Sequence, residues 1–191
     1  MARDKKQHLI ETALQLFNKH GYHATGIDTI MTVSGVSKTT LYKYFRSKEI
    51  LILAVLEYRH QSLVELFEAT IQASREAYPQ ADESYHLHAF FDALQAWFKD
   101  DNFFGCNFIN ASAEFADKEH PVHKYACQHK HWLRNCLKTL LHDGLLAEQV
   151  MLLVDGAIVT AQVQNAPQAA ETARQLACRL CELPAQQAST A

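Results

Sequence analysis

The fold is decided by residues 25–51, which read TGIDTIMTVSGVSKTTLYKYFRSKEIL. This stretch predicts two short helices, one ending at Ser34 and one running from Lys38 to about Phe45. A tight turn at Ser34-Gly35-Val36 separates them, and glycine makes such a turn possible. The spacing is typical of a helix-turn-helix, which sets its second helix across its first.

Capping patterns support both helix starts. Thr25-Gly26-Ile27-Asp28 predicts a capping box, in which the Thr25 hydroxyl accepts a hydrogen bond from a free backbone N–H and the carboxylate reaches back. Ser37 is the expected cap of the second helix. An earlier helix is expected from Asp4 to His20, where Gly21 stops it.

The second short helix carries the side chains that a helix in a DNA groove needs. Lys38, Thr39 and Thr40 lie at its N-terminal end, where base edges are usually contacted, and Tyr42 and Lys43 follow one turn later. The residues expected to hold this helix to the core are Leu41, Tyr44 and Phe45.

Lys48 begins the next helix, where its charge adds to the free N–H groups and the helix dipole. This position favours a phosphate contact. Taken by themselves, these patterns also fit a polar, solvated helix in a small bundle.

Residues 25–30 and 34–51 closely resemble the signature of the TetR/AcrR family of repressors, over about the first third of the chain. The resemblance implies a three-helix head and a dimer that binds a palindromic DNA operator and is released by a small molecule. By the same likeness, phosphate contacts fall to Thr25, Tyr42 and Lys48. The positions expected near DNA bases are Lys38, Thr39, Thr40 and Lys43, with Ser37 beside them as the cap.

Charge is distributed unevenly along the 191 residues, whose formal net charge is −3. Residues 1–50 hold eight Lys and Arg against four Asp and Glu, and the remainder holds ten against seventeen. A basic end and an acidic remainder are expected when only one end meets phosphate. We therefore expect a DNA-binding head at 1–46 and a ligand-sensing, dimerising body at 47–191.

The body is expected to be entirely helical, which makes the whole protein all-α. No stretch approaches the ~20 uninterrupted apolar residues that span a bilayer, and the N-terminus is no secretion signal. Five cysteines, an odd number, fit reduced thiols, so we expect a cytoplasmic protein. After a long helix from Ser47 to about Tyr78, the expected helices are 85–100, 104–116, 119–143, 147–165 and 168–182.

Large apolar side chains gather in the middle of the body. At helical spacing they can be ordinary core, or part of them can line an apolar pocket for an effector. Asn110 and Glu114 interrupt them on one helix face. These two could orient a ligand's polar end, or simply cap a helix or bond between helices. The candidate ligand-binding residues are Phe91, Leu94, Trp97, Phe104, Phe108, Asn110, Glu114 and Trp132.

Two other features suggest sensing chemistry. Cys106 lies near a helix N-terminus, where the dipole favours a thiolate. Sensing of electrophiles or oxidants through Cys106 is therefore the alternative to a reversible ligand. Cys106 can also be an inert, packed side chain. His120, His123 and Cys127 could share a metal within a cluster that extends to His131. The cluster lacks a tight four-ligand pattern, so we expect no metal and no cofactor.

The last two helices carry continuous apolar material. In similar regulators this pair forms the dimer interface, and we expect Ile158 to lie in it. Intramolecular core is the competing interpretation. No Ser/His/Asp arrangement, phosphate-binding loop or paired-carboxylate motif stands out, so an enzyme is not expected.

Overall fold

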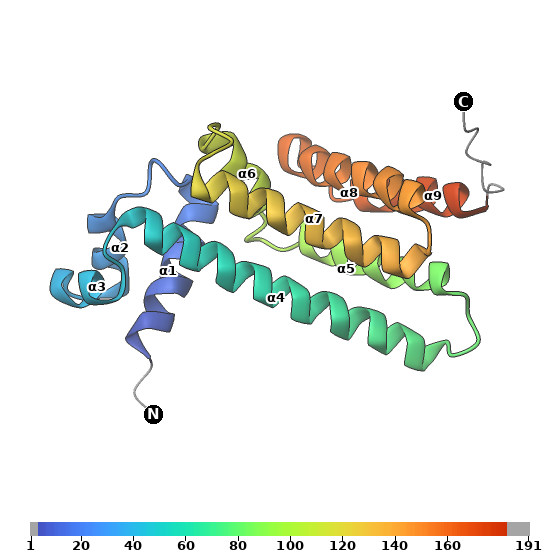
Figure 1. The fold of residues 1–191 in the computed structure, drawn as a ribbon, viewed down its shortest axis with the longest axis horizontal. Coiled ribbons are helices and arrows are strands. Elements are labelled where there is room, and N and C mark those ends of the chain that lie inside the picture. The colour runs from blue at the N-terminus through green and yellow to red at the C-terminus, as the bar shows by residue number, and fades with distance from the viewer. Residues whose placement is uncertain (1–3, 183–191) are drawn as a thin grey trace. The chain divides into compact units, whose positions relative to one another are not determined.

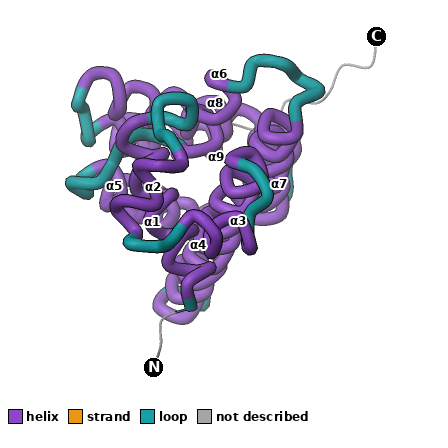
Figure 2. Tube along the Cα trace, turned by 90° about the vertical axis from the view of Figure 1, so that its left-hand side faces the viewer, coloured by secondary structure: helices purple, strands orange, loops and turns teal. Residues whose placement is uncertain are grey.

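The computed structural model describes residues 4–182, and within them the chain is all-α, as predicted (Figures 1 and 2). Helices predicted from 85, 104 and 147 begin a few residues away from those starts. The elements are α1 (Lys5–His20), α2 (Ile27–Ser34), α3 (Lys38–Tyr44), α4 (Lys48–Ala77), the 3-10 helix η1 (Glu83–His86), α5 (Leu87–Phe98), α6 (Asn107–Glu114), α7 (Pro121–Leu141), α8 (Gly144–Gln164) and α9 (Ala169–Glu182).

The chain divides into two compact units. The first contains the described residues up to Leu66 and the segment Phe104–Trp132. The second contains Phe67–Phe103 and the described residues from Leu133 onward. The head therefore shares its compact unit with the first part of α4, with α6 and with the start of α7. This unit extends beyond the expected boundary at residue 46.

The head forms around an apolar core. Figure 1 shows α1, α2 and α3 gathered beside the first turns of α4. Most apolar positions at helical spacing point inward, and their burial is the main force that stabilises such a small bundle. The buried side chains are Leu9, Ala13, Phe17, Ile30, Leu41, Phe45, Leu51, Ile52, Val55 and Leu56.

The start of α2 differs from the predicted capping box. Gly26 is its N-cap and no side chain caps it. The Thr25 hydroxyl points inward and donates to the carbonyls of Gly21 at 2.7 Å and Leu16 at 3.3 Å. Thr25 therefore fastens the loop to the end of α1, and the capping prediction was wrong.

Gly35 makes the turn between α2 and α3. It adopts the left-handed conformation, with φ 67° and ψ 14°, and its N–H donates to the Met31 carbonyl at 2.9 Å. A Cβ at this position would meet nothing within 4 Å. The need for glycine is therefore conformational and not steric, because an L side chain disfavours this backbone region.

We predict that Gly35→Ala lowers the free energy of unfolding by about 1–2 kcal/mol, since alanine pays the full left-handed penalty without a clash. Gly35→Asn is the matched control and should lose less, because asparagine tolerates this conformation. Urea denaturation of the three proteins measures the difference. Equal stability of the alanine variant and the wild type would contradict this account of the turn.

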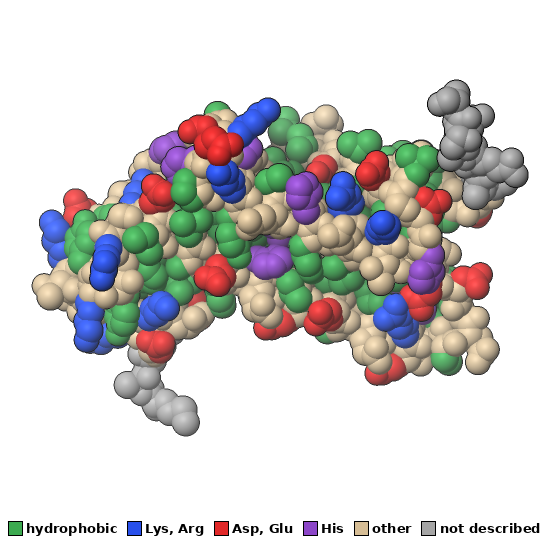
Figure 3. Space-filling view, viewed as in Figure 1, with side chains coloured by type: hydrophobic (Ala, Val, Ile, Leu, Met, Phe, Trp, Pro, Cys, Tyr) green, Lys and Arg blue, Asp and Glu red, His purple; other side chains and the backbone are tan. Residues whose placement is uncertain are grey.

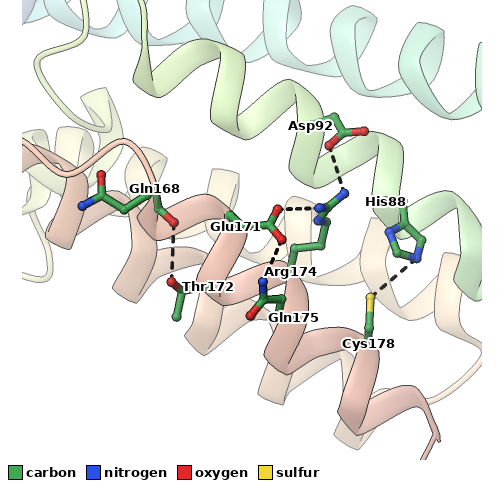
Figure 4. A network of polar contacts seen from close by, with 8 residues as sticks. All are labelled: His88, Asp92, Gln168, Glu171, Thr172, Arg174, Gln175 and Cys178. Carbon is green, nitrogen blue, oxygen red and sulfur yellow. Dashed lines mark hydrogen bonds and ion pairs between the residues drawn. The ribbon is translucent and has the colours of Figure 1, made fainter.

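The second unit packs α9 against α8 and α5. Small residues on the buried face of α9 let the helices approach closely. Figure 4 shows two polar contacts between α9 and α5: Arg174 binds Asp92 at 3.3 Å, and Cys178 Sγ lies 3.6 Å from His88 Nε2. The small buried residues of α9 are Ala169, Ala170, Ala173 and Ala177.

Helix α8 is long and apolar enough, by length and composition alone, to cross a membrane. One face of it is core, and Ile158, which we expected in the dimer interface, is only 4% exposed there. The opposite face carries an exposed stripe at spacings of seven and four residues, which places its members on one side of the helix. We define the α8 stripe as Leu145, Leu152, Val159 and Val163.

Candidate nucleic-acid interface and effector site

Helix α3 is held by its apolar side and presents its polar side to solvent. Leu41 and the following Phe45 are buried, whereas Lys38, Thr39 and Lys43 are exposed. Figure 3 shows Lys and Arg side chains standing among apolar and uncharged atoms over α2 and α3. This surface offers both positive charge and hydrogen-bonding groups to a nucleic acid.

Ser37 fixes the start of α3. Its Oγ accepts a hydrogen bond from the Thr40 N–H at 3.3 Å and lies 3.0 Å from the Thr40 hydroxyl. The predicted cap is therefore confirmed. Because Ser37 also orients the Thr40 hydroxyl, it acts on the predicted base-contacting surface through its neighbour.

Two head residues lie differently from their predicted positions. Thr25 is 2% exposed and both of its hydroxyl contacts are internal, so it offers no free hydroxyl to a phosphate. Tyr44, expected in the core, is 37% exposed. The phase of a seven-residue helix explains Tyr44: Leu41 and Phe45 share a face at i and i+4, and Tyr44 lies beside that face.

Lys48 is the first residue of α4 and is half-buried. Its ammonium donates to the His23 carbonyl at 3.1 Å. Burial lowers the pKa of Lys48, and the nearby Glu114 carboxylate acts in the opposite direction. The predicted phosphate-contacting cation is thus held in place by the loop between α1 and α2, residues 21–26.

Glu114, predicted to orient a ligand, has both carboxylate oxygens engaged within the first unit. The backbone N–H of Tyr22 donates to Oε1 at 2.8 Å and that of His23 donates to Oε2 at 2.7 Å. These contacts join residues more than 90 positions apart. The sequence allowed a structural hydrogen bond for Glu114 but could not name its partner, because nothing near Glu114 in the chain indicates which loop it contacts.

An aromatic cluster brings together two of the predicted ligand residues. Phe108 stacks on His129, with ring centroids 3.5 Å apart and planes 8° apart. Trp132 lies 5.4 Å from His129 and 5.0 Å from His60. We define the aromatic cluster as His60, Phe108, Tyr125, His129 and Trp132.

The two histidines of the aromatic cluster form a neutral pair. Their Nδ1 atoms are 3.0 Å apart, so one donates and the other accepts. Burial, aided by the charge of Lys130, lowers the pKa of His129 to about 3. Burial also lowers the pKa of His60. The cluster therefore presents an uncharged, largely aromatic surface at neutral pH.

This pKa shift predicts that the protein loses stability on acidification. Below pH 6.5 the unfolded His129 binds a proton that the folded side chain does not bind until about pH 3, so the unfolded state is favoured as the pH falls through that window. From pH 7 to pH 5 the contribution is about 2 kcal/mol, at about 1.4 kcal/mol per pH unit.

His129→Gln is the control, since glutamine can still bond to His60 but does not titrate. Urea denaturation at pH 7 and pH 5 should show a smaller loss in the variant than in the wild type. The same loss in both proteins would mean that His129 does not carry this dependence.

The other predicted ligand residues divide between the units. Phe104 accepts a hydrogen bond from the Asn110 side chain at 3.1 Å in the first unit. In the second unit, Trp97 packs edge-to-face on Phe103 at 5.0 Å. Phe91 and Leu94 are buried in the second unit. The ligand role of all these residues stays a prediction.

Cys106 is the N-cap residue of α6 and is 5% exposed. Helix α6 begins at Asn107 and not at 104, because Gly105 has φ 87°, which a right-handed helix excludes. Cys106 therefore sits at a helix N-terminus, as predicted, but inside the first unit. Its proposed reaction with an electrophile requires movement of the surrounding residues.

The histidines of the predicted metal cluster have separate partners. His123 Nδ1 donates to the Phe115 carbonyl at 2.8 Å, and His120 Nε2 lies 3.7 Å from a Glu49 carboxylate oxygen. Cys127 lies 3.8 Å from His131. Among residues 4–182, no three His, Cys, Asp or Glu side chains come together as a metal site.

Comparisons with known proteins match both the head and the fold. Residues 9–55 match the family model described as bacterial regulatory proteins, tetR family. A TetR-family transcriptional regulator from Streptomyces coelicolor, SCO4454, superposes with a TM-score of 0.83 at 26% identity, over 93% of this chain and 94% of that one. The head thus matches the TetR family by sequence, and the whole chain shares the fold of a TetR-family regulator.

Sequence relatives match only the first part of this chain, whereas solved structures match nearly all of it. RutR of Escherichia coli (strain K12) is 39% identical over 72 residues, 38% of this chain and 32% of RutR. The activator FasR of Mycolicibacterium smegmatis is 43% identical over 65 residues, 34% of this chain and 30% of FasR. The alignments thus span about a third of these relatives. Reduced E. coli NemR shares the fold, with a TM-score of 0.83 at 21% identity over 96% of this chain and 100% of that one.

Proposed function

We propose that this protein is a transcriptional regulator that binds a palindromic DNA operator as a homodimer and is released by a small apolar or aromatic molecule. The observation that carries the proposal is the polar face of α3, where Lys38, Thr39 and Lys43 are exposed while Leu41 fixes the helix to the core. A single helix of this length contacts few bases, so specificity requires two copies on successive turns of the duplex.

Selection from a random duplex pool tests DNA binding. The wild type should return a palindromic sequence whose halves lie about one helical turn apart, or a multiple of it. Lys38→Ala and Lys43→Ala should change the selected bases, since a good base contact is worth roughly 1–3 kcal/mol of discrimination. The control Lys99→Ala removes an exposed charge from the end of α5 and should return the wild-type sequence. If all four proteins select the same sequence, α3 does not contact bases.

The direction of regulation is proposed as repression. FasR is named an activator, so activation is the competing outcome. A reporter placed behind the selected sequence distinguishes them, because a repressor lowers its transcription and an activator raises it.

The α8 stripe supports the proposed dimer. Leu152 is 75% exposed and Val163 is comparably exposed, which is costly for apolar side chains in a monomer. A Cβ at Gly156, on the same side of α8, would meet nothing within 4 Å, so the surface there is open to close approach by another helix. Exposed Leu176 extends the apolar surface onto α9. A second copy of the chain is the occupant that the family resemblance implies.

Leu152→Arg should convert the dimer to a monomer and abolish operator binding although the head is unchanged. Arginine at this exposed position leaves the protomer folded but places an unpaired charge in the proposed interface, which costs several kcal/mol. Ala96→Arg, at an exposed position on α5, adds the same charge outside the stripe and should remain dimeric. Light scattering reports the mass of each protein. A folded, dimeric Leu152→Arg protein would place the interface elsewhere.

The aromatic cluster is the proposed effector site within the first unit. Its neutral histidine pair lies among aromatic rings and carries no charge, which suits an uncharged aromatic molecule better than a cation or an anion. Cys106 remains the alternative sensor. An electrophile that releases DNA from the wild type, but not from Cys106→Ser, would favour that alternative.

A further inference from the structure

Helix α6 is held to the head at both of its ends. At its first residue, the Tyr22 hydroxyl donates to the Asn107 carbonyl at 3.0 Å, and the Asn107 side chain lies 3.4 Å from that of Asn18. At its last residue, Glu114 accepts hydrogen bonds from the N–H groups of Tyr22 and His23. A shift of α6 relative to the head therefore breaks at least one of these contacts.

The position of Glu114 opposes local electrostatics. It is the last residue of α6, and the C-terminus of a helix disfavours a negative charge. The two N–H donors and the charge of Lys48 offset that cost. A charge that is unfavourable in its own helix but is stabilised by distant contacts often marks a functional position.

His23 connects Glu114 to Lys48. Its N–H donates to Glu114 Oε2 at 2.7 Å, its Nε2 lies 3.0 Å from the Glu114 carbonyl, and its own carbonyl accepts from Lys48 Nζ at 3.1 Å. A Cβ added to Gly21 would lie 2.9 Å from Glu114 Oε1. The Glu114 carboxylate therefore lies in close contact with the α1–α2 loop, and the His23 carbonyl of that loop binds the Lys48 ammonium.

The other side of α6 contacts the aromatic cluster. Phe108, the second residue of the helix, stacks on His129. Any molecule that separates these two rings must move Phe108 or His129. A continuous series of contacts thus runs from the aromatic cluster through α6 to Glu114, His23 and Lys48, all inside the first unit.

We propose that Glu114 is a positioning residue for DNA binding, which holds the α1–α2 loop and, through His23, places Lys48 to contact phosphate. The proposal rests on the proposed function, since it assigns Lys48 to the DNA interface.

Glu114→Gln tests the proposal, because an amide presents an NH2 group to one of the two N–H donors. Glu119→Gln is the control: it makes the same charge change at an exposed residue that pairs with Lys124. Binding to the duplex selected by the wild type is measured over a range of salt concentrations. We expect Glu114→Gln to weaken binding roughly tenfold relative to the control and to lower the slope of log affinity against log salt by about one unit.

A double-variant cycle with Lys48→Ala separates positioning from a general loss of structure. If Glu114 acts through Lys48, adding Glu114→Gln to Lys48→Ala produces no further loss of affinity or slope. Circular dichroism and light scattering verify that each protein is helical and dimeric.

Equal affinity and slope for Glu114→Gln and Glu119→Gln would overturn the inference, and so would independent, additive losses in the double-variant cycle. A wild type that selects no duplex would overturn the proposed function itself, and the inference with it. Operator binding that depends on Lys38 and Lys43 but not on Glu114 would leave the proposed function standing and remove the inference alone.

Discussion

The Glu114 carboxylate accepts hydrogen bonds from two backbone N–H groups and thereby fastens α6 to the α1–α2 loop within the first unit. The α1–α2 loop has no regular structure to satisfy the N–H groups of Tyr22 and His23, and unpaired N–H groups are costly wherever water is excluded. A carboxylate from α6 satisfies both, and a charged acceptor makes such hydrogen bonds about twice as strong as neutral ones. The head is thereby completed by a helix from the body, which is why the compact unit does not end at residue 46.

The first unit contains three functional features. The polar face of α3 is exposed, the Lys48 ammonium is held by the loop, and the aromatic cluster lies on the other side of α6. Packed side chains and short hydrogen bonds connect the loop and the cluster, because α6 contacts both. The second unit contributes the exposed apolar side chains of the α8 stripe, which we propose as the dimer interface.

Much of the fold could be predicted from the sequence, because local chemistry determines it. The apolar spacing of α1 and α4, the Gly35 turn and the Ser37 cap each depend on residues a few positions apart. Predictions failed where a distant partner decides. Thr25 has a capping sequence, yet its hydroxyl bonds to Leu16 and Gly21 because the loop folds back on α1. Ile158 is apolar like its exposed neighbour Val159, and only the packing of α8 shows which of them faces the core.

The polar contacts between helices were the hardest to anticipate. For Glu114 the sequence left open a ligand contact or a structural bond, and the structure gives it partners at residues 22 and 23. His129 carries no sequence signal for its position, yet it is buried against Phe108 and paired with His60. Helical periodicity tells which side of a helix is buried, but it does not tell which element covers that side.

Amide hydrogen exchange at Tyr22 and His23 tests most directly whether the Glu114 carboxylate holds the loop. Both N–H groups belong to a short loop, and the His23 side chain is exposed, so without a partner they would exchange near the rate of an unstructured peptide. We predict that the N–H groups of Tyr22 and His23 exchange slowly, in the range of the α1 amides. Glu114→Gln should accelerate the exchange of both groups and leave that of the α1 amides unchanged. Fast exchange at Tyr22 and His23 in the wild-type protein would contradict this prediction.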